Sequence, residues 1–355
     1  MKKLTKIKKI ILSILAVIFV VFCVLAGNLI NQFTPVSKDK NAELVKFGIP
    51  YGTNSYVVTQ QLKEQNLIKN PKIFYYLLLR PKYLKIIYPK VQMPEKLDFQ
   101  CGLYKISPSM NYAEIIQIFA EGRKEIIKVS IPEGLTISKV ATLLEKNEIC
   151  KKDKFIDACY NKEIIDSFQI PADSLEGYLF PDTYYLDYGM DEKQIANLMV
   201  KTFFTQIKSI EGFEKLTPVQ IHETVKLASV VEREYRLPEE APLIASVFSN
   251  RIKNSIGLYS CATVEYIITE ILGKPHPTRI FDSDLKIDNP YNTYMYNGLP
   301  PGPISNPGVV ALKASAKPAK TDYFYFQVAD PSIGKHVFNK TFSEHVQNHN
   351  LYTKD

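Results

Sequence analysis

The sequence predicts an α+β protein with a single N-terminal transmembrane helix, small α/β subdomains after it, and a mixed α/β domain in the C-terminal half. Three observations support this prediction. An uncharged apolar run lies near the N-terminus, a strand–turn–helix pattern recurs at an offset of 82 residues, and the chain becomes rich in aromatic and turn residues from about residue 171. The composition fits a folded chain with a sizeable core, since 46% of the 355 residues are hydrophobic and 23% are charged.

The positive charge of the chain is concentrated at its N-terminus. The formal net charge is +7, and five of these seven charges come from lysines within residues 1–9. The rest of the chain is close to neutral. Because nucleic-acid binding depends on neutralising many phosphates, we expect no nucleic-acid partner.

Residues 10–30 are predicted to be a transmembrane signal anchor. They carry no charge, and about 20 apolar residues span a bilayer as a helix. The lysines lie on one side only, so the positive-inside rule makes residues 1–9 a cytoplasmic tail. A cleaved signal peptide is the alternative, but its apolar region would be about 7–15 residues long. Everything after about residue 31 is therefore expected outside the cytoplasm.

Residues 31–44 form a polar linker, and an internal repeat follows within residues 45–170. The motif IPYG at 49–52 recurs as IPEG at 131–134. Each copy predicts a short strand, a Pro-x-Gly turn and an amphipathic helix. The matched apolar positions are Val58 with Val140, Leu62 with Leu144, and Leu67 with Ile149. Between the copies we expect a strand at 99–106 and a helix at 110–120.

Residues 171–355 are predicted to form a separate domain. Thr217 is a good N-cap, Pro218 suits the first helical position, and Gln220 completes a capping box. This helix should run to about Tyr235. The other elements expected in this domain are helices at 191–206, 238–253 and 307–316, and a hairpin of 322–329 with 335–339.

Glu232 is the candidate catalytic residue. At 100° per residue, Ile221, Val225 and Ala228 lie within about 40° of it on the helix surface. A carboxyl in apolar surroundings has a raised pKa, and a carboxyl protonated near neutral pH is what a general acid for glycosidic cleavage requires. From the helix alone, an ordinary surface glutamate is the alternative. Glu234 falls on the other side and reads as surface or as support.

The sequence gives no reason to expect a metal or a cofactor. His222-Glu223 resembles the opening of a zinc-protease motif, but Lys226 stands where the second histidine is needed. The five histidines are scattered, and GxSxG, P-loop and GxGxxG motifs are absent. Metal-dependent protease, α/β-hydrolase, NTPase and dinucleotide-binding functions therefore lose their usual support.

Two neighbouring segments suit sugar binding. YNTY at 291–294 is followed by GLPPGPI at 298–304, whose glycines and prolines specify a rigid, irregular loop. Aromatic faces stack on pyranose rings, and amides bond hydroxyl and N-acetyl groups. A purely structural turn is the alternative.

Together, these segments resemble the endolytic murein transglycosylase family, also called YceG-like. The matching motifs occur in family order along most of the chain. They are IPEG (131–134), LEGYLFPDTY (175–184), LASVVERE (227–234), ASVFSNR (245–251), YNTY (291–294), GLPPGPI (298–304), ASAKPA (314–319) and the FN of the hairpin (338–339).

The resemblance implies a membrane-anchored enzyme of the bacterial cytoplasmic (inner) membrane, with its catalytic domain on the periplasmic or extracytoplasmic side. It implies cleavage between MurNAc and GlcNAc within peptidoglycan glycan strands, leaving 1,6-anhydro-MurNAc ends and ending the elongation of nascent strands. It also implies LysM-like folding for residues 45–170, a YceG-like catalytic domain at 171–355, Glu232 as the acid, and cell-wall synthesis proteins as partners. Substrate binding is expected of Glu176, Asn292, Tyr294 and Glu234.

One position departs from the family pattern. The family has Leu-x-x-Asp-x-Thr where residues 258–263 place Cys261 at the aspartate position, and Glu265 follows four residues later. Either Glu265 compensates or the enzyme is slower. The departure keeps open the alternative of a catalytically weak or inactive peptidoglycan-binding scaffold of cell-wall synthesis. A muramidase-type hydrolase that uses water is the other alternative.

Overall fold

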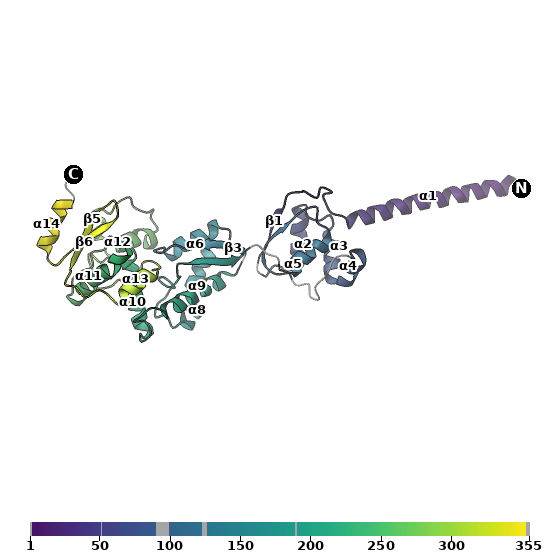
Figure 1. Cartoon of the computed structure of the whole chain (residues 1–355). Coiled ribbons are helices and arrows are strands. Elements are labelled where there is room, and N and C mark those ends of the chain that lie inside the picture. Colours follow the sequence, from purple (N-terminus) through teal and green to yellow (C-terminus); the bar gives the residue numbers. More distant parts are fainter. Residues whose placement is uncertain (1, 51, 90–98, 123–125, 189, 353–355) are drawn as a thin grey trace. The chain divides into compact units, whose positions relative to one another are not determined.

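The computed structural model describes residues 2–50, 52–89, 99–122, 126–188 and 190–352 (Figure 1). Tyr51 of the first repeat motif lies outside these residues. Helices dominate the described chain, and its strands form three two-stranded sheets, so the α+β class is confirmed at that level. The chain divides into two compact units. The first contains residues up to 127 together with 187–190, and the second contains 128–186 and the residues from 191 onward.

Helix α1, Lys2–Gln32, begins the first unit. Its segment Ile11–Gln32 has 22 residues, a mean hydropathy of 2.7 and no buried portion. At a rise of about 1.5 Å per residue, this length suffices for a hydrocarbon core about 30 Å thick. The predicted apolar helix is therefore present, and it continues backward through the lysine-rich tail.

Both copies of the repeat have the same order of elements: a strand, three helices, and a second strand that pairs with the first. Copy one consists of β1 (Val45–Ile49), α2 (Ser55–Glu64), α3 (Pro71–Leu79), α4 (Pro81–Ile87) and β2 (Gly102–Ile106). Copy two consists of β3 (Ile126–Ser130), α6 (Ile137–Lys146), α7 (Lys152–Cys159), α8 (Lys162–Ser167) and β4 (Thr183–Asp187). Helix α5 (Tyr112–Ala120) lies between the copies in the sequence.

The repeat extends to the backbone of each turn and first helix. Gly52 and Gly134 adopt positive φ values of 73° and 74°, which glycine allows without a Cβ clash. Two residues later, Asn54 and Thr136 cap α2 and α6 with their side chains.

The ends of these two helices also match. The residues after them that adopt positive φ are Asn66 and Glu148, again 82 residues apart. The equivalent closing bonds run from Leu67 N–H to Leu62 O at 2.9 Å and from Ile149 N–H to Leu144 O at 3.1 Å. All the apolar positions matched in the sequence are buried. The compact division separates the copies into different units, and the predicted boundary at residue 170 stays a prediction.

In the second unit, α13 (Val309–Ala316) packs against α10 (Pro218–Val231) and α11 (Ala241–Lys253). Its remaining elements are α9 (Glu192–Ile207), a 3-10 turn Pro238–Glu240, α12 (Cys261–Tyr266), a π-helical turn Ile267–Ile271, a 3-10 turn Asp284–Lys286, β5 (Tyr325–Asp330), β6 (Lys335–Asn339) and α14 (Phe342–Tyr352). Strands β5 and β6 are antiparallel, as the sequence predicts.

Helix α10 begins as predicted and ends earlier than predicted. Thr217 and Gln220 form the capping box, with Pro218 in the first turn. The predicted end at Tyr235 is wrong, because the helix ends at Val231. The N–H groups of the next residues close tight turns, including Arg233 N–H to Val230 O at 3.1 Å. Glu232 therefore stands at the end of the helix, where a carboxyl can be directed away from the helix surface.

Gly177 provides a stability test of the packing that holds the LEGYLFPDTY segment on α10. Its φ is +88°, and an added Cβ would lie 2.6 Å from Pro303 Cβ and 2.7 Å from Val225 Cγ1. Gly298 is a matched control, because its φ is +90° but, apart from its chain neighbours, no atom of the described residues lies within 4 Å of an added Cβ. We expect Gly298→Ala to cost about 1–2 kcal/mol from backbone strain alone. Gly177→Ala should cost about 1–3 kcal/mol more from the overlap.

Denaturant unfolding of the full chain in detergent, with the two variants side by side, measures this difference. Equal losses of stability in the two variants would contradict the close packing described at Gly177.

Candidate functional site

Glu232 presents its carboxyl at the end of α10, half-buried and held by two donors. The backbone N–H of Gly308 donates to Oε2 at 2.9 Å, and the hydroxyl of Tyr235 donates to Oε1 at 3.1 Å. Burial raises the pKa of Glu232 to about 7, against the two hydrogen bonds and the Arg233 charge, which lower it. The negative charge of Glu133 raises it further. The carboxyl is therefore partly protonated at neutral pH.

The loop 304–308 brings Gly308 to Glu232 because it is bonded to the last turns of α10. The N–H of Ile304 donates to Ser229 Oγ at 3.0 Å, and the hydroxyl of Ser305 donates to Ser229 O at 3.0 Å. Ser229 lies three residues before Glu232, so one helix carries both the acid and the attachment of the loop that binds it.

Glu176 supports this loop from the other side. Its buried carboxyl accepts bonds from Ile137 N–H and from Asn306 Nδ2, the latter at 3.1 Å. The backbone of Asn306 is in turn bonded to Gly134 and Leu135. Burial raises the pKa of Glu176 to about 8. Glu176 thus ties the IPEG turn to the loop that contacts Glu232. Its predicted contact with substrate stays a prediction.

Glu234 lies on a cavity that Glu232 does not line. It lines a cavity of about 530 Å³ together with Arg251, Tyr259 and Tyr294. Burial raises the pKa of Glu234, and the hydroxyl of Ser260 donates to its carboxyl. A cavity with aromatic rings, a carboxyl and a guanidinium has the chemistry of a sugar-binding site.

Tyr294 and Cys261 meet at the edge of this cavity. The Tyr294 hydroxyl lies 3.1 Å from Cys261 Sγ. Asn292, in contrast, is fully buried, and its Nδ2 donates to Leu285 O at 3.0 Å and to Ile287 O at 2.8 Å. Its Oδ1 accepts from the N–H of Tyr294. These bonds favour a structural role for Asn292, which fixes Tyr294, over the predicted contact with a sugar.

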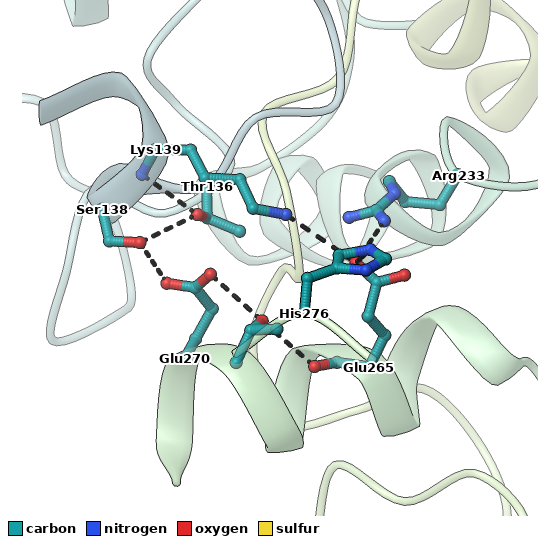
Figure 2. Close-up of polar contacts among 8 residues, drawn as sticks. Thr136, Ser138, Lys139, Arg233, Glu265, Glu270 and His276 are labelled. Carbon is teal, nitrogen blue, oxygen red and sulfur yellow. Dashed lines mark hydrogen bonds and ion pairs between the residues drawn. The ribbon is translucent and has the colours of Figure 1, made fainter. Parts of the chain in front are cut away.

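Glu265 is surrounded by basic side chains (Figure 2). Arg233 lies 2.8 Å from its Oε1, His276 3.0 Å and Lys139 3.7 Å. Burial raises the pKa of Glu265, but these neighbours outweigh it and hold the pKa below its usual value. The carboxyl is engaged in these ion pairs, which argues against Glu265 replacing the aspartate of the family at Cys261. It instead fixes Arg233 next to Glu232.

Three participants were not identified from the sequence: Glu133, Tyr235 and Gly308. Glu133 lies in the IPEG motif, and its Cγ is 2.5 Å from the position that a Cβ on Gly308 would take. Tyr235 follows Glu232 by three residues, a spacing that brings side chains together at a helix end. For Gly308 the sequence carries no local signal, since its partner lies 76 residues away.

Within the described ranges, no three His, Cys, Asp or Glu side chains gather as a metal site requires.

Glu133 should control the titration of Glu232. Removing its negative charge with Glu133→Gln leaves the ionised form of Glu232 less repelled, so the pKa of Glu232 should fall below about 7. Carbon-13 NMR of labelled glutamate carboxyls measures this pKa directly, with Glu232→Gln identifying the resonance. Glu163→Gln, at an exposed carboxyl, is the control. An unchanged or higher pKa in Glu133→Gln would contradict the proximity of the two carboxyls.

Three known proteins resemble this chain along most of its length. The endolytic murein transglycosylase of Bacillus subtilis (strain 168) is 32% identical over 330 residues, covering 88% of this chain and 85% of the relative. That of Streptococcus pneumoniae (strain D39) is 24% identical over 346 residues, and the match spans 60% of the length of that relative. A solved YceG-like protein from Listeria monocytogenes is 31% identical with a TM-score of 0.55, covering 86% of this chain and 99% of that one.

The same relationship appears at the level of the family. The model of the YceG-like family matches residues 47–351, which include the second copy of the repeat, all but the first two residues of the first copy, Glu232 and the loop that binds it. The chain therefore belongs to the YceG-like family.

Proposed function

We propose that this protein is an endolytic peptidoglycan lytic transglycosylase that cleaves the MurNAc–GlcNAc bond within glycan strands and leaves 1,6-anhydro-MurNAc ends. The observation that supports it most is the half-buried carboxyl of Glu232, whose pKa is about 7. The relatives named endolytic murein transglycosylase support the same reaction.

Glu232 acts first as an acid and then as a base in this proposal. Its proton goes to the glycosidic oxygen as the C1–O bond breaks, with oxocarbenium character at C1 of MurNAc. The resulting carboxylate takes the proton of the C6 hydroxyl, whose oxygen forms the new bond to C1. Gly308 N–H and Tyr235 hold the carboxyl throughout. One carboxyl is sufficient because no water is consumed.

The cavity beside Glu234 is the proposed sugar subsite. Tyr259 and Tyr294 offer aromatic faces, and Arg251 and Glu234 offer a donor and an acceptor for hydroxyl and acetamido groups. Glu176 acts at a distance by holding the loop 304–308. Cys261 at the cavity edge replaces a family carboxylate by a thiol, which weakens polar contact with the substrate there.

The remaining domains fit this activity at a membrane. Residues 10–30 anchor the chain in the bacterial cytoplasmic membrane, with residues 1–9 in the cytoplasm and the catalytic domain, residues 171–355, outside. Residues 45–170 are LysM-like and contribute to glycan binding. They contain the first β-α-α-α-β copy and the second copy up to α8, whose closing strand β4 follows at Thr183–Asp187. Ending the elongation of nascent strands requires proximity to cell-wall synthesis proteins, which are the proposed partners.

A water-using hydrolase is the second candidate, and Glu133 is the observation that favours it. Glycosidases that use water have a second carboxyl near the acid, and Glu133 lies close enough to raise the pKa of Glu232. Glu133 is exposed and carries no hydrogen bond to Glu232 among the described contacts. The transglycosylase is favoured because the relatives carry that name.

Mass spectrometry of digested peptidoglycan distinguishes these functions. The full chain in detergent should release fragments with anhydro-MurNAc ends, and Glu232→Gln should lose activity by about 100-fold or more, because general acid catalysis contributes about 10²–10⁴-fold. Glu163→Gln is the matched control and should cleave like the unchanged protein.

Reducing ends would show a hydrolase, and their loss in Glu133→Gln would assign Glu133 as its base. Glycan binding by both the unchanged protein and Glu232→Gln, without any cleavage, would show a scaffold.

A further inference from the structure

Helices α3 and α4 of the first unit expose an apolar and aromatic face to solvent. Ile86 is 72% exposed, Leu79 59% and Tyr76 50%, and Ile87 is also exposed. Large side chains exposed singly are ordinary, but four of them within twelve consecutive residues form a patch that needs a partner.

The end of α1 lies beside α3 and α4 (Figure 1), and residues from this end and from both helices line one groove. Leu29 and Phe33 line a groove of about 340 Å³ together with Tyr76, Tyr83 and Ile87. Polar contacts fix the end of α1 and the residue after it, Phe33, against the unit at this point. Lys69 Nζ donates to Asn31 Oδ1 at 2.8 Å, and the hydroxyl of Tyr88 donates to Phe33 O at 2.6 Å.

The groove lies at the level along α1 where the apolar segment ends. That segment ends at Gln32, and Leu29 stands three residues earlier. With a rise of about 1.5 Å per residue, Leu29 is about 4.5 Å inside the end of the segment. Side chains that share a groove with Leu29 therefore lie at the boundary between acyl chains and head groups once α1 spans a bilayer.

The polar residues of α3 and α4 suit a lipid surface. Residues 71–88 contain no acidic side chain, and their basic residues are Lys72, Arg80, Lys82 and Lys85. Arg80 and Lys82 lie over the rings of Tyr76 and Tyr83, at 5.8 Å and 5.2 Å from the ring centroids. Tyrosines with basic side chains beside them are typical of membrane interfaces, where the rings lie among head groups and the cations meet anionic lipids.

We propose that α3 and α4 form a membrane-seating surface that inserts Leu79, Ile86 and Ile87 into the outer leaflet beside α1. This inference rests on the proposed anchoring of the chain by α1. The first unit then contacts the bilayer directly and is not joined to it by a flexible linker alone. This contact fixes the distance between the first unit and the membrane surface. The occupant of the exposed face is lipid and not a second protein.

The sequence contains no tryptophan, so one introduced tryptophan is a unique fluorescent probe. We would compare Ile86→Trp and Tyr76→Trp with Phe19→Trp in α1 and with Tyr185→Trp, an exposed position in the second unit. All four positions are exposed, so the substitutions leave the core intact. The full-length variants are reconstituted in vesicles of anionic and zwitterionic lipids, with and without bromine atoms on the acyl chains.

Ile86→Trp and Tyr76→Trp should emit at shorter wavelength than Tyr185→Trp and be quenched by brominated lipid, as Phe19→Trp is. Blue-shifted emission without quenching would mean that protein covers the face and would overturn the proposal. Emission of Ile86→Trp like that of Tyr185→Trp would overturn it as well. If Phe19→Trp is not quenched, the anchoring itself fails, whereas quenching of Phe19→Trp alone contradicts only the seating surface.

Discussion

The proposed activity depends on the carboxyl of Glu232, which must be partly buried and also fixed in position by hydrogen bonds. Shifting the pKa of Glu232 from 4.5 to about 7 corresponds to a penalty on its ionised form on the order of 3 kcal/mol. Burial imposes that penalty, and the donors Gly308 and Tyr235 reduce it without removing it. Donors that were stronger or more numerous would leave a carboxylate with no proton to give. A carboxyl without donors would have no fixed direction.

The second copy of the repeat contributes to this balance, and the first copy does not. Both copies have the same Pro-x-Gly motif. Among the described residues beyond its chain neighbours, no atom lies within 4 Å of a Cβ added at Gly52, whereas a Cβ at Gly134 would lie 3.5 Å from Arg233 and 3.7 Å from Glu232. The turn of copy two also binds Asn306 and, through it, Glu176. One structural module thus occurs twice, once in the first unit, which begins with α1, and once as a wall of the candidate active site.

Local features could be predicted from the sequence because their physical causes are local. The capping box at Thr217, the hairpin of β5 and β6 and the matched turns of the repeat depend on neighbouring residues, and the structure contains them. The apolar periodicity made Glu232 a candidate, with an ordinary surface glutamate as the alternative. Its catalytic role came from the resemblance to the family and stays a prediction. The early end of α10 and the contact with Gly308 depend on segments far apart in the chain, so no local pattern encodes them. Asn292 looked like a sugar ligand because an amide binds a backbone carbonyl with the same chemistry as a hydroxyl.

The pH dependence of glycan cleavage tests the central claim most directly. If Glu232 donates the proton, only its protonated form starts the reaction, so kcat/KM for cleavage should fall as the pH rises through about 7. Profiles of the unchanged protein and Glu163→Gln should coincide. Activity that stays constant or rises between about pH 6 and 9, from roughly one unit below the expected pKa to two units above it, would contradict the claim that burial makes Glu232 the acid.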